Sequence, residues 1–178
     1  FEGDRYFQAD SRQVAGETEF QAIATPGHTR DHVSYYFPKE GLLLPGDHVL
    51  PEITPNLSPD LFCPDFRPLR SFLDSLTRIE TLPAVKVYPA HGDPFPDLAA
   101  RIREIKAHHE ERKGLALDSV ARGPRTTFEV SRDIFGDDLP EFDRFLALNE
   151  TFVHLIELVH EGVMIEERSK GHALFRTA

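Results

Sequence analysis

The distribution of proline and the spacing of apolar residues divide this sequence into two kinds of segment. Twelve of its fourteen prolines lie in residues 1–96, where short apolar runs end at proline or glycine. Short runs of β-branched and aromatic residues with such boundaries are typical of strands joined by turns. From residue 97 onward, apolar residues recur every three or four positions, which is typical of helices. We therefore predict an αβ domain over residues 1–96 and a mainly helical domain over residues 97–178.

The first domain is predicted to be a layered α/β structure. Apolar residues with helical spacing predict an amphipathic helix over residues 69–82. Residues 49–66 contain four prolines and no regular periodicity, so we predict a loop that shapes a nearby site. The expected strands are Tyr6–Ala9, Phe20–Thr25, Val33–Phe37, Leu42–Leu44 and Val85–Tyr88.

The second domain is predicted to contain three helices and a terminal β-hairpin. Asp97 is a suitable N-cap for the first helix, and Thr126 with Glu129 forms the pattern of a capping box at the second. The third helix is expected over residues 140–161, with Gly162 as the residue that ends it. A hairpin over residues 164–176 completes a pattern that is typical of winged-helix domains.

The charge and cysteine content exclude several classes of protein. The formal net charge is -10, and residues 107–178 hold nine Lys and Arg against fourteen Asp and Glu. A nucleic-acid-binding role is therefore disfavoured, because such binding depends on Lys and Arg at phosphates. A single cysteine, Cys63, excludes an internal disulfide and a cysteine-based zinc site. We see no transmembrane segment or signal peptide, and we expect a cytoplasmic location.

The residues suited to metal chemistry occur in turns that follow predicted strands. Imidazole and carboxylate groups are ligands for Zn²⁺, Mn²⁺ or Fe, and ligand sites in open α/β sheets gather at the carboxyl ends of strands. A neighbouring glycine lets the backbone turn sharply at each position. The residues concerned are His28, Asp47 with the adjacent His48, and His91.

Three segments containing these turns, Thr25–His32, Pro45–Leu50 and Tyr88–Gly92, resemble the later motifs of the metallo-β-lactamase superfamily. The resemblance implies the C-terminal half of an αββα sandwich, followed by the winged-helix-like domain of a bacterial subgroup. It further implies that His28 is a ligand of the first metal and His91 a ligand of the second. Asp47 would bridge both metals and orient the nucleophile. His32 and His48 are candidates for lining the substrate pocket.

The first motif of that superfamily, His-x-His-x-Asp-His, is absent from this sequence. Either the N-terminal half is missing or the chain is a degenerate relative. Because the chain does not begin with methionine, we expect a fragment whose N-terminal half is missing. With one histidine per metal and a shared carboxylate, we expect this chain alone to bind metal poorly and to be inactive. A homodimer that assembles a site between two copies is the alternative.

For the intact protein, the resemblance implies a hydrolase with two metal ions, with zinc as the expected metal and Mn²⁺ or Fe as alternatives. A metal-bound hydroxide would attack an ester, thioester or lactone in a small-molecule substrate. A metal-dependent nuclease and a non-catalytic protein-interaction domain remain alternatives. The remaining histidines are predicted to lie at the surface or at helix ends; they are His108, His109, His154, His160 and His172.

Overall fold

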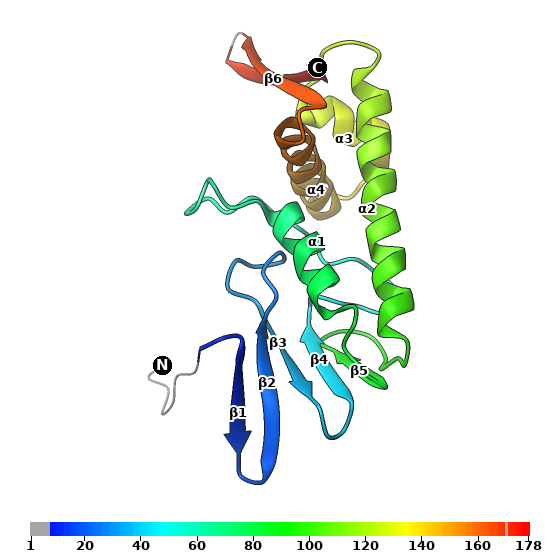
Figure 1. The fold of residues 1–178 in the computed structure, drawn as a ribbon. Coiled ribbons are helices and arrows are strands. Elements are labelled where there is room, and N and C mark those ends of the chain that lie inside the picture. The colour runs from blue at the N-terminus through cyan, green and yellow to red at the C-terminus, as the bar shows by residue number, and fades with distance from the viewer. Residues whose placement is uncertain (1–7, 170) are drawn as a thin grey trace. The chain divides into compact units, whose positions relative to one another are not determined.

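The computed structural model describes residues 8–169 and 171–178, and its chain divides into two compact units (Figure 1). The first unit takes in the residues up to Pro55 together with Ser71–Glu104. The second unit consists of Asn56–Arg70 and Ile105–Ala178. The division passes through the helices α1, Pro68–Ile79, and α2, Leu98–Val120. The predicted domain boundary near residue 96 stays a prediction.

The first unit contains a five-stranded sheet with the order β1-β2-β3-β4-β5. Strands β1 to β4 form an antiparallel meander, whereas β5 runs parallel to β4. Consequently β2, β4 and β5 all point in the same direction. The strands are β1 Ser11–Ala15, β2 Thr18–Ala24, β3 Val33–Phe37, β4 Leu42–Gly46 and β5 Lys86–Pro89.

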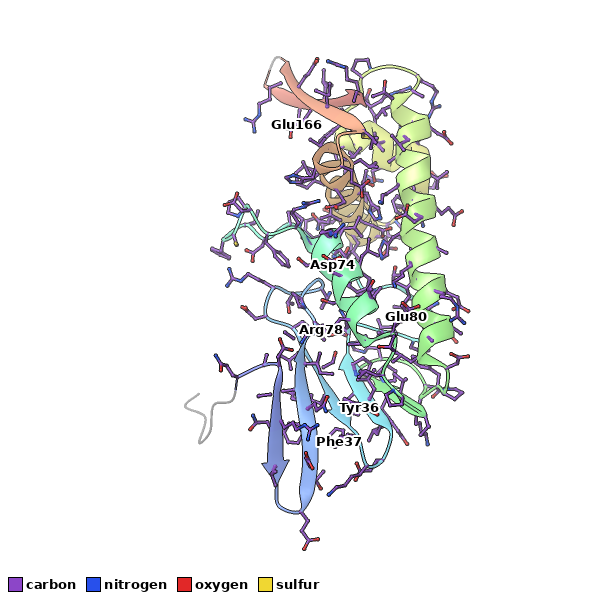
Figure 2. All side chains as sticks on the ribbon, in the orientation of Figure 1. Tyr36, Phe37, Asp74, Arg78, Glu80 and Glu166 are labelled. Atoms are coloured by element: carbon purple, nitrogen blue, oxygen red, sulfur yellow. The ribbon has the colours of Figure 1, made fainter. Side chains whose placement is uncertain are left out.

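The core of the first unit combines one row of α1 side chains with inward-facing residues of the sheet. Phe72, Leu76 and Ile79 recur at helical spacing and are fully buried. Two hydrogen bonds tie α1 to the end of β2, because Ser75 donates to the Pro26 carbonyl and Arg78 to the Ala24 carbonyl. In the sheet, the fully buried apolar residues are Ala22, Leu43 and Val87. Tyr36 of β3, which is labelled in Figure 2, is also buried.

The second unit contains most of α2, the helices α3, Thr127–Phe135, and α4, Glu141–His160, and the antiparallel hairpin of β6, Met164–Ser169, and β7, His172–Thr177. Thr126 and Glu129 form a capping box at α3, as predicted. Gly162 follows α4 with a positive φ, also as predicted. The buried cluster of this unit comprises Ala116, Val120, Val130, Leu155, Leu158, Met164 and Phe175.

Two sequence-based predictions are wrong. Ala9 lies in a turn, and the first strand is β1, Ser11–Ala15; Tyr6 and Phe7 lie outside the described residues. Apolar patterning does not reveal this strand, because β1 is a polar edge strand that a two-residue turn joins to β2. His109 and His154 were expected at the surface, yet both are buried, with 1% exposure each.

Within residues 8–169 and 171–178, no helix is long and apolar enough to cross a bilayer.

Candidate functional site

The three turns singled out in the sequence lie at one edge of the five-stranded sheet. His28 follows β2, Asp47 follows β4 and His91 follows β5. Because these strands run in the same direction, their carboxyl ends share that edge. The parallel pairing of β4 and β5 continues to the turn itself, where the Ala90 amide donates to the Gly46 carbonyl at 3.0 Å.

Asp47 lies next to both histidines. One carboxylate oxygen is 4.0 Å from Nε2 of His28, and the other is 3.3 Å from Nε2 of His91. The side chains of His28 and Asp47 are 32% and 33% exposed, and that of His91 is 75% exposed. The arrangement therefore presents two imidazole nitrogens and a bidentate carboxylate to solvent, the donor types that borderline divalent metals prefer.

The glycines in two of these turns leave room for specific neighbours. A Cβ atom at Gly46, where φ is +58°, would lie 2.7 Å from Nε2 of His32. A Cβ atom at Gly27 would lie 2.6 Å from the Cα atom of Phe72 in α1. Both distances are shorter than van der Waals contact allows. Each glycine thus permits a close approach that fixes the backbone immediately before His28 or Asp47.

Phe72 packs against two of the turns that form the site. Its backbone and ring pack against Gly27, and its ring lies edge-on to His48 with centroids 4.7 Å apart. Phe72 is fully buried, so its position is set by packing in the core. The sequence identifies Phe72 only as a helix residue on the apolar face, because its contact with the two turns depends on tertiary structure.

His32 is fixed by a chain of hydroxyl groups. Its Nδ1 atom is 2.8 Å from Oγ1 of Thr25, which lies 2.9 Å from Oγ of Ser34. Burial and the neighbouring His28 lower the pKa of His32, while Asp47 opposes this shift. The neutral form is therefore favoured at pH 7, and Nε2 faces the Gly46 backbone that leads into Asp47.

His48, which follows Asp47, is fully buried. Neither of its ring nitrogens has a hydrogen-bond partner among the described residues. Burial, together with the nearby His32 and His28, lowers the pKa of His48 to about 3, so the ring is neutral at pH 7. His32 and His48 were predicted from the sequence to line the substrate pocket, and that role stays a prediction for both.

The backbone that follows Asp47 is held by Arg101 of α2. Its guanidinium donates to the Leu50 carbonyl at 2.7 Å and to the Ile53 carbonyl at 3.0 Å. No regular helix or strand forms between residues 49 and 66, in agreement with the predicted loop. Arg101 satisfies carbonyl groups that the absent secondary structure leaves without partners.

The donors at these turns number fewer than a metal ion requires. A protein zinc site uses three or four ligands at about 2.0–2.3 Å. Over residues 8–169 and 171–178, no group of three or more His, Cys, Asp or Glu side chains is arranged so that it could hold an ion. His28, Asp47 and His91 are therefore chemically suitable donors, but they do not form a complete site by themselves.

A second histidine cluster lies within the helical unit. Nδ1 of His109 is 3.1 Å from Nε2 of His154, and Nδ1 of His154 is 2.6 Å from the Glu150 carbonyl oxygen. Burial is the largest cause that lowers the pKa of His109 to about 2, and the neighbouring His154, His108, Arg112 and Lys113 lower it further. Burial also lowers the pKa of His154. These hydrogen bonds connect α2 to α4 through neutral rings.

Comparison with known proteins identifies the family. Residues 2–91 match the family described as the metallo-beta-lactamase superfamily. A beta-lactamase-like protein 2 homolog from Caenorhabditis elegans is 30% identical over 152 residues, covering 85% of this chain and 48% of that protein. An atrochrysone carboxyl ACP thioesterase from Emericella nidulans is 29% identical over 164 residues, covering 89% and 50%.

The fold agrees with this assignment. The crystal structure of a metallo-beta-lactamase family protein from Thermus thermophilus superposes with a TM-score of 0.83 and 31% identity, covering 96% of this chain and 53% of that one. The chain belongs to the metallo-beta-lactamase superfamily, whose members are typically hydrolases that bind divalent metals. It spans about half the length of the curated relatives that it matches.

Proposed function

We propose that this chain supplies part of the active site of a dinuclear, metal-dependent hydrolase. In this proposal His28 would hold the first metal, His91 would hold the second, and Asp47 would be shared between them. The observation that supports it most is the position of the Asp47 carboxylate, whose two oxygens approach the two imidazoles separately. Zinc is the metal we favour, and Mn²⁺ or Fe suits the same donors.

The remaining ligands would come from a segment with the His-x-His-x-Asp-His pattern, which this sequence does not contain. Zinc bound at such a centre lowers the pKa of a coordinated water to about 7. The contribution of this chain is to hold three donors in place. Phe72 and Gly27 fix the turn before His28, and His32 against Gly46 fixes the turn before Asp47.

We propose a thioester as the substrate class, within the wider group of esters and lactones. One relative of similar coverage is named as an acyl-carrier-protein thioesterase. The net charge of -10 is compatible with a neutral acyl group and unfavourable for a polyphosphate such as RNA. A nuclease is therefore the less favoured enzyme.

The test uses the complete gene product that contains this chain, purified and assayed for release of thiol from an acyl thioester. Asp47→Asn is expected to lower kcat by at least about 100-fold, since metal-site geometry depends on this carboxylate. His172→Gln, a change at an exposed histidine in β7, is the matched control and should leave kcat unchanged. Metal content by mass spectrometry provides a readout that does not depend on activity.

A non-catalytic interaction domain is the second candidate, and the incomplete donor set among the described residues is the observation that favours it. The two functions differ in a measurable way. The hydrolase contains about two metal ions per active site when purified, and Asp47→Asn loses them. The interaction domain contains no stoichiometric metal and hydrolyses no thioester in either form.

A further inference from the structure

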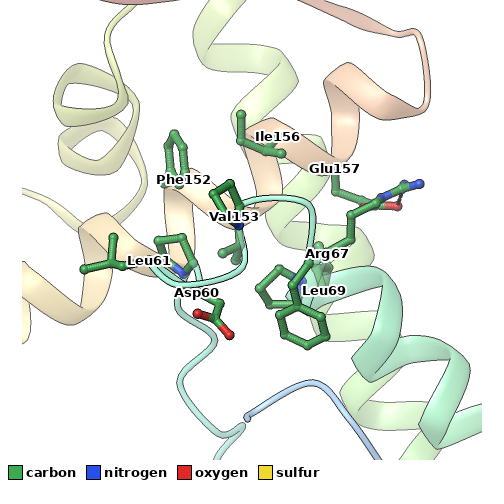
Figure 3. A pocket seen from close by; sticks show the side chains of 12 residues that line it. Asp60, Leu61, Arg67, Leu69, Phe152, Val153, Ile156 and Glu157 are labelled. Atoms are coloured by element: carbon green, nitrogen blue, oxygen red, sulfur yellow. Dashed lines mark hydrogen bonds and ion pairs between the residues drawn. The ribbon is translucent and has the colours of Figure 1, made fainter. Parts of the chain in front are cut away.

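Two arginines form hydrogen bonds that hold the irregular backbone between β4 and α1, and their acceptors differ. Arg67 forms a bidentate ion pair with Glu157 of α4 beside an apolar pocket, with Nε 3.1 Å from Oε2 and Nη2 2.6 Å from Oε1 (Figure 3). Arg101 instead donates to two backbone carbonyl groups of the segment that follows Asp47. The second arginine therefore fixes backbone close to a proposed metal ligand.

Arg101 lies near the start of α2, and its side chain is 13% exposed. Its Nε atom donates to the Leu50 carbonyl at 2.7 Å, and Nη2 donates to the Ile53 carbonyl at 3.0 Å. The remaining nitrogen, Nη1, donates to Glu104 at 2.9 Å. Because a guanidinium group is planar and rigid, its donors point in fixed directions, and the two carbonyl groups are held at a fixed separation.

The segment that Arg101 holds packs against the turn that carries His91. A Cβ atom at Gly92 would lie 2.5 Å from Cγ of Pro51 and 3.1 Å from its Cδ. The backbone just after His91 therefore lies directly against the proline ring. Pro51 lies between the two carbonyl groups that Arg101 binds, so its ring is held in position against this turn.

Backbone hydrogen bonds hold other parts of the same turn. The Ala90 amide donates to the Gly46 carbonyl at 3.0 Å, and Val87 and Phe95 exchange two hydrogen bonds at 2.8 and 3.1 Å. The side chain of His91 is 75% exposed, so the position of its ring depends mainly on the backbone of the turn. These bonds fix the residues before the histidine, and the proline contact fixes the residue after it.

We propose that Arg101 is a positioning residue for His91. By holding the segment around Pro51, it keeps the turn beside Asp47, whose carboxylate oxygen lies 3.3 Å from Nε2 of His91. This inference rests on the proposed function, in which His91 would hold the second metal. The turn of His28 does not share this dependence, because its glycine packs against α1 instead. Loss of Arg101 should therefore affect one of the two metals.

The experiment compares Arg101→Lys with Arg103→Lys in the complete gene product, first without metal. Lysine keeps the charge but cannot donate to two carbonyl groups in fixed directions. Arg103 is exposed on the same helix, so it provides the matched control. Hydrogen exchange at the Ala90 amide should be about tenfold faster in Arg101→Lys and unchanged in the control, as expected for the loss of a hydrogen bond to a charged group.

Exchange in the β6–β7 hairpin shows whether the effect is local, and its rate should be the same in all three proteins. An unchanged rate at Ala90 in Arg101→Lys would overturn the proposal. Equal acceleration at Ala90 and in the hairpin would indicate general destabilisation and would overturn it too.

Zinc release from the same proteins gives the second readout. In a chelator titration, Arg101→Lys should release one of its two zinc ions about tenfold more readily than the wild type and the other ion unchanged, because partners that orient a ligand contribute about 10–100-fold to metal affinity. Normal retention of both ions, or equally easier release of both, would overturn the role of Arg101 alone. A wild-type protein without stoichiometric zinc would overturn the proposed function and this inference with it.

Pro51→Ala tests the contact through which Arg101 is proposed to act. This variant removes the proline ring and leaves the arginine and both carbonyl groups in place. It should accelerate exchange at Ala90 and release one zinc ion more readily, as Arg101→Lys does, and the double variant should show no larger effect than either single variant. Effects that multiply in the double variant would contradict the proposal, because the two residues would then act separately.

Discussion

Two groups of histidines in this protein differ in their exposure to solvent and in what their ring nitrogens contact. His28 and His91 lie on turns at a sheet edge, partly exposed, with their Nε2 atoms toward Asp47. His109 and His154 lie inside the helical unit, stacked with ring centroids 5.2 Å apart and hydrogen-bonded to each other.

This difference in exposure distinguishes a histidine that can act as a metal ligand from one that stabilises the folded structure. A metal ligand needs an accessible nitrogen and neighbours that hold the ring in position from behind. Burial removes that access. In the buried His109–His154 pair, Nδ1 of His109 is hydrogen-bonded to Nε2 of His154, so neither of these two nitrogens is available to a metal. This comparison is the reason why we propose His28 and His91, whose side chains are 32% and 75% exposed, rather than the buried pair, as metal ligands.

The largest effect is expected from Phe72→Ala, which removes a fully buried ring beneath the site turns. Loss of such a ring destabilises a protein by about 3–5 kcal/mol. Urea unfolding of the variant measures this, and Phe62→Ala, at a 97% exposed phenylalanine, is the control with an expected change within about 0.5 kcal/mol. Similar midpoints for the two variants would contradict the supporting role of Phe72.

The next effect concerns the buried pair. His109→Ala leaves a cavity and a buried His154 nitrogen without its partner, so it should cost about 2–3 kcal/mol of unfolding free energy. His91→Ala, at a side chain that is 75% exposed, should change it by less than about 0.5 kcal/mol. If the two variants unfolded at the same urea concentration, the distinction between the two groups would be lost.

Acid should destabilise the protein through its buried neutral histidines. The pKa is about 3 for His48 and about 2 for His109 in the folded state, against 6.5 for a model histidine. Protons therefore bind preferentially to the unfolded chain below a pH of about 6.5. Stability is highest above that pH and falls with decreasing pH toward these folded values, by up to about 1.4 kcal/mol per pH unit for each group.

Urea unfolding between about pH 7 and pH 5 measures this slope. His109→Gln removes one of the groups that bind a proton only in the unfolded chain. The dependence of unfolding free energy on pH should therefore be less steep in this variant, by about the contribution of one histidine. An unchanged slope in the variant would show that His109 is not the source of the acid sensitivity.

The smallest effect is expected at a turn. Gly46→Ala places a side chain at a φ of +58° and 2.7 Å from His32, so it should cost about 1 kcal/mol or slightly more. Gly171→Ala is the matched control, since its φ is +84° and no heavy atom lies within 4 Å of the added Cβ. Both variants carry backbone strain, and only Gly46→Ala should also displace Asp47. Equal losses in thermal stability would argue against the His32 contact.

Much of the fold was predictable from residue spacing. Proline and glycine marked the strand ends, and apolar periodicity located α1, α2 and α4. The capping box at Thr126 located the start of α3. The edge strand β1 was not predictable in this way, because its only large apolar residue is Val14, which is 62% exposed.

The site was predictable only in part. His28, Asp47 and His91 were predicted because each lies in a glycine-containing turn after a strand. Strands that run in the same direction bring such turns to one edge of the sheet. The burial of His109 was not predicted, although it lies four positions after Ile105 and thus on the same helix face. The Arg67–Glu157 pair joins residues 90 positions apart, and no local pattern in the sequence indicates it.

In the proposed function, His28, Asp47 and His91 form a partial donor set. Equilibrium dialysis of this chain with zinc at neutral pH measures how much binding these three side chains provide. A complete structural zinc site supplies about 10–16 kcal/mol. We predict weak binding with a Kd above about 1 μM, or less than about 8 kcal/mol, that is lost in Asp47→Ala and kept in His172→Ala. Nanomolar binding by the chain alone would show that its donor set is complete, and binding that Asp47→Ala leaves unchanged would show that the zinc lies elsewhere.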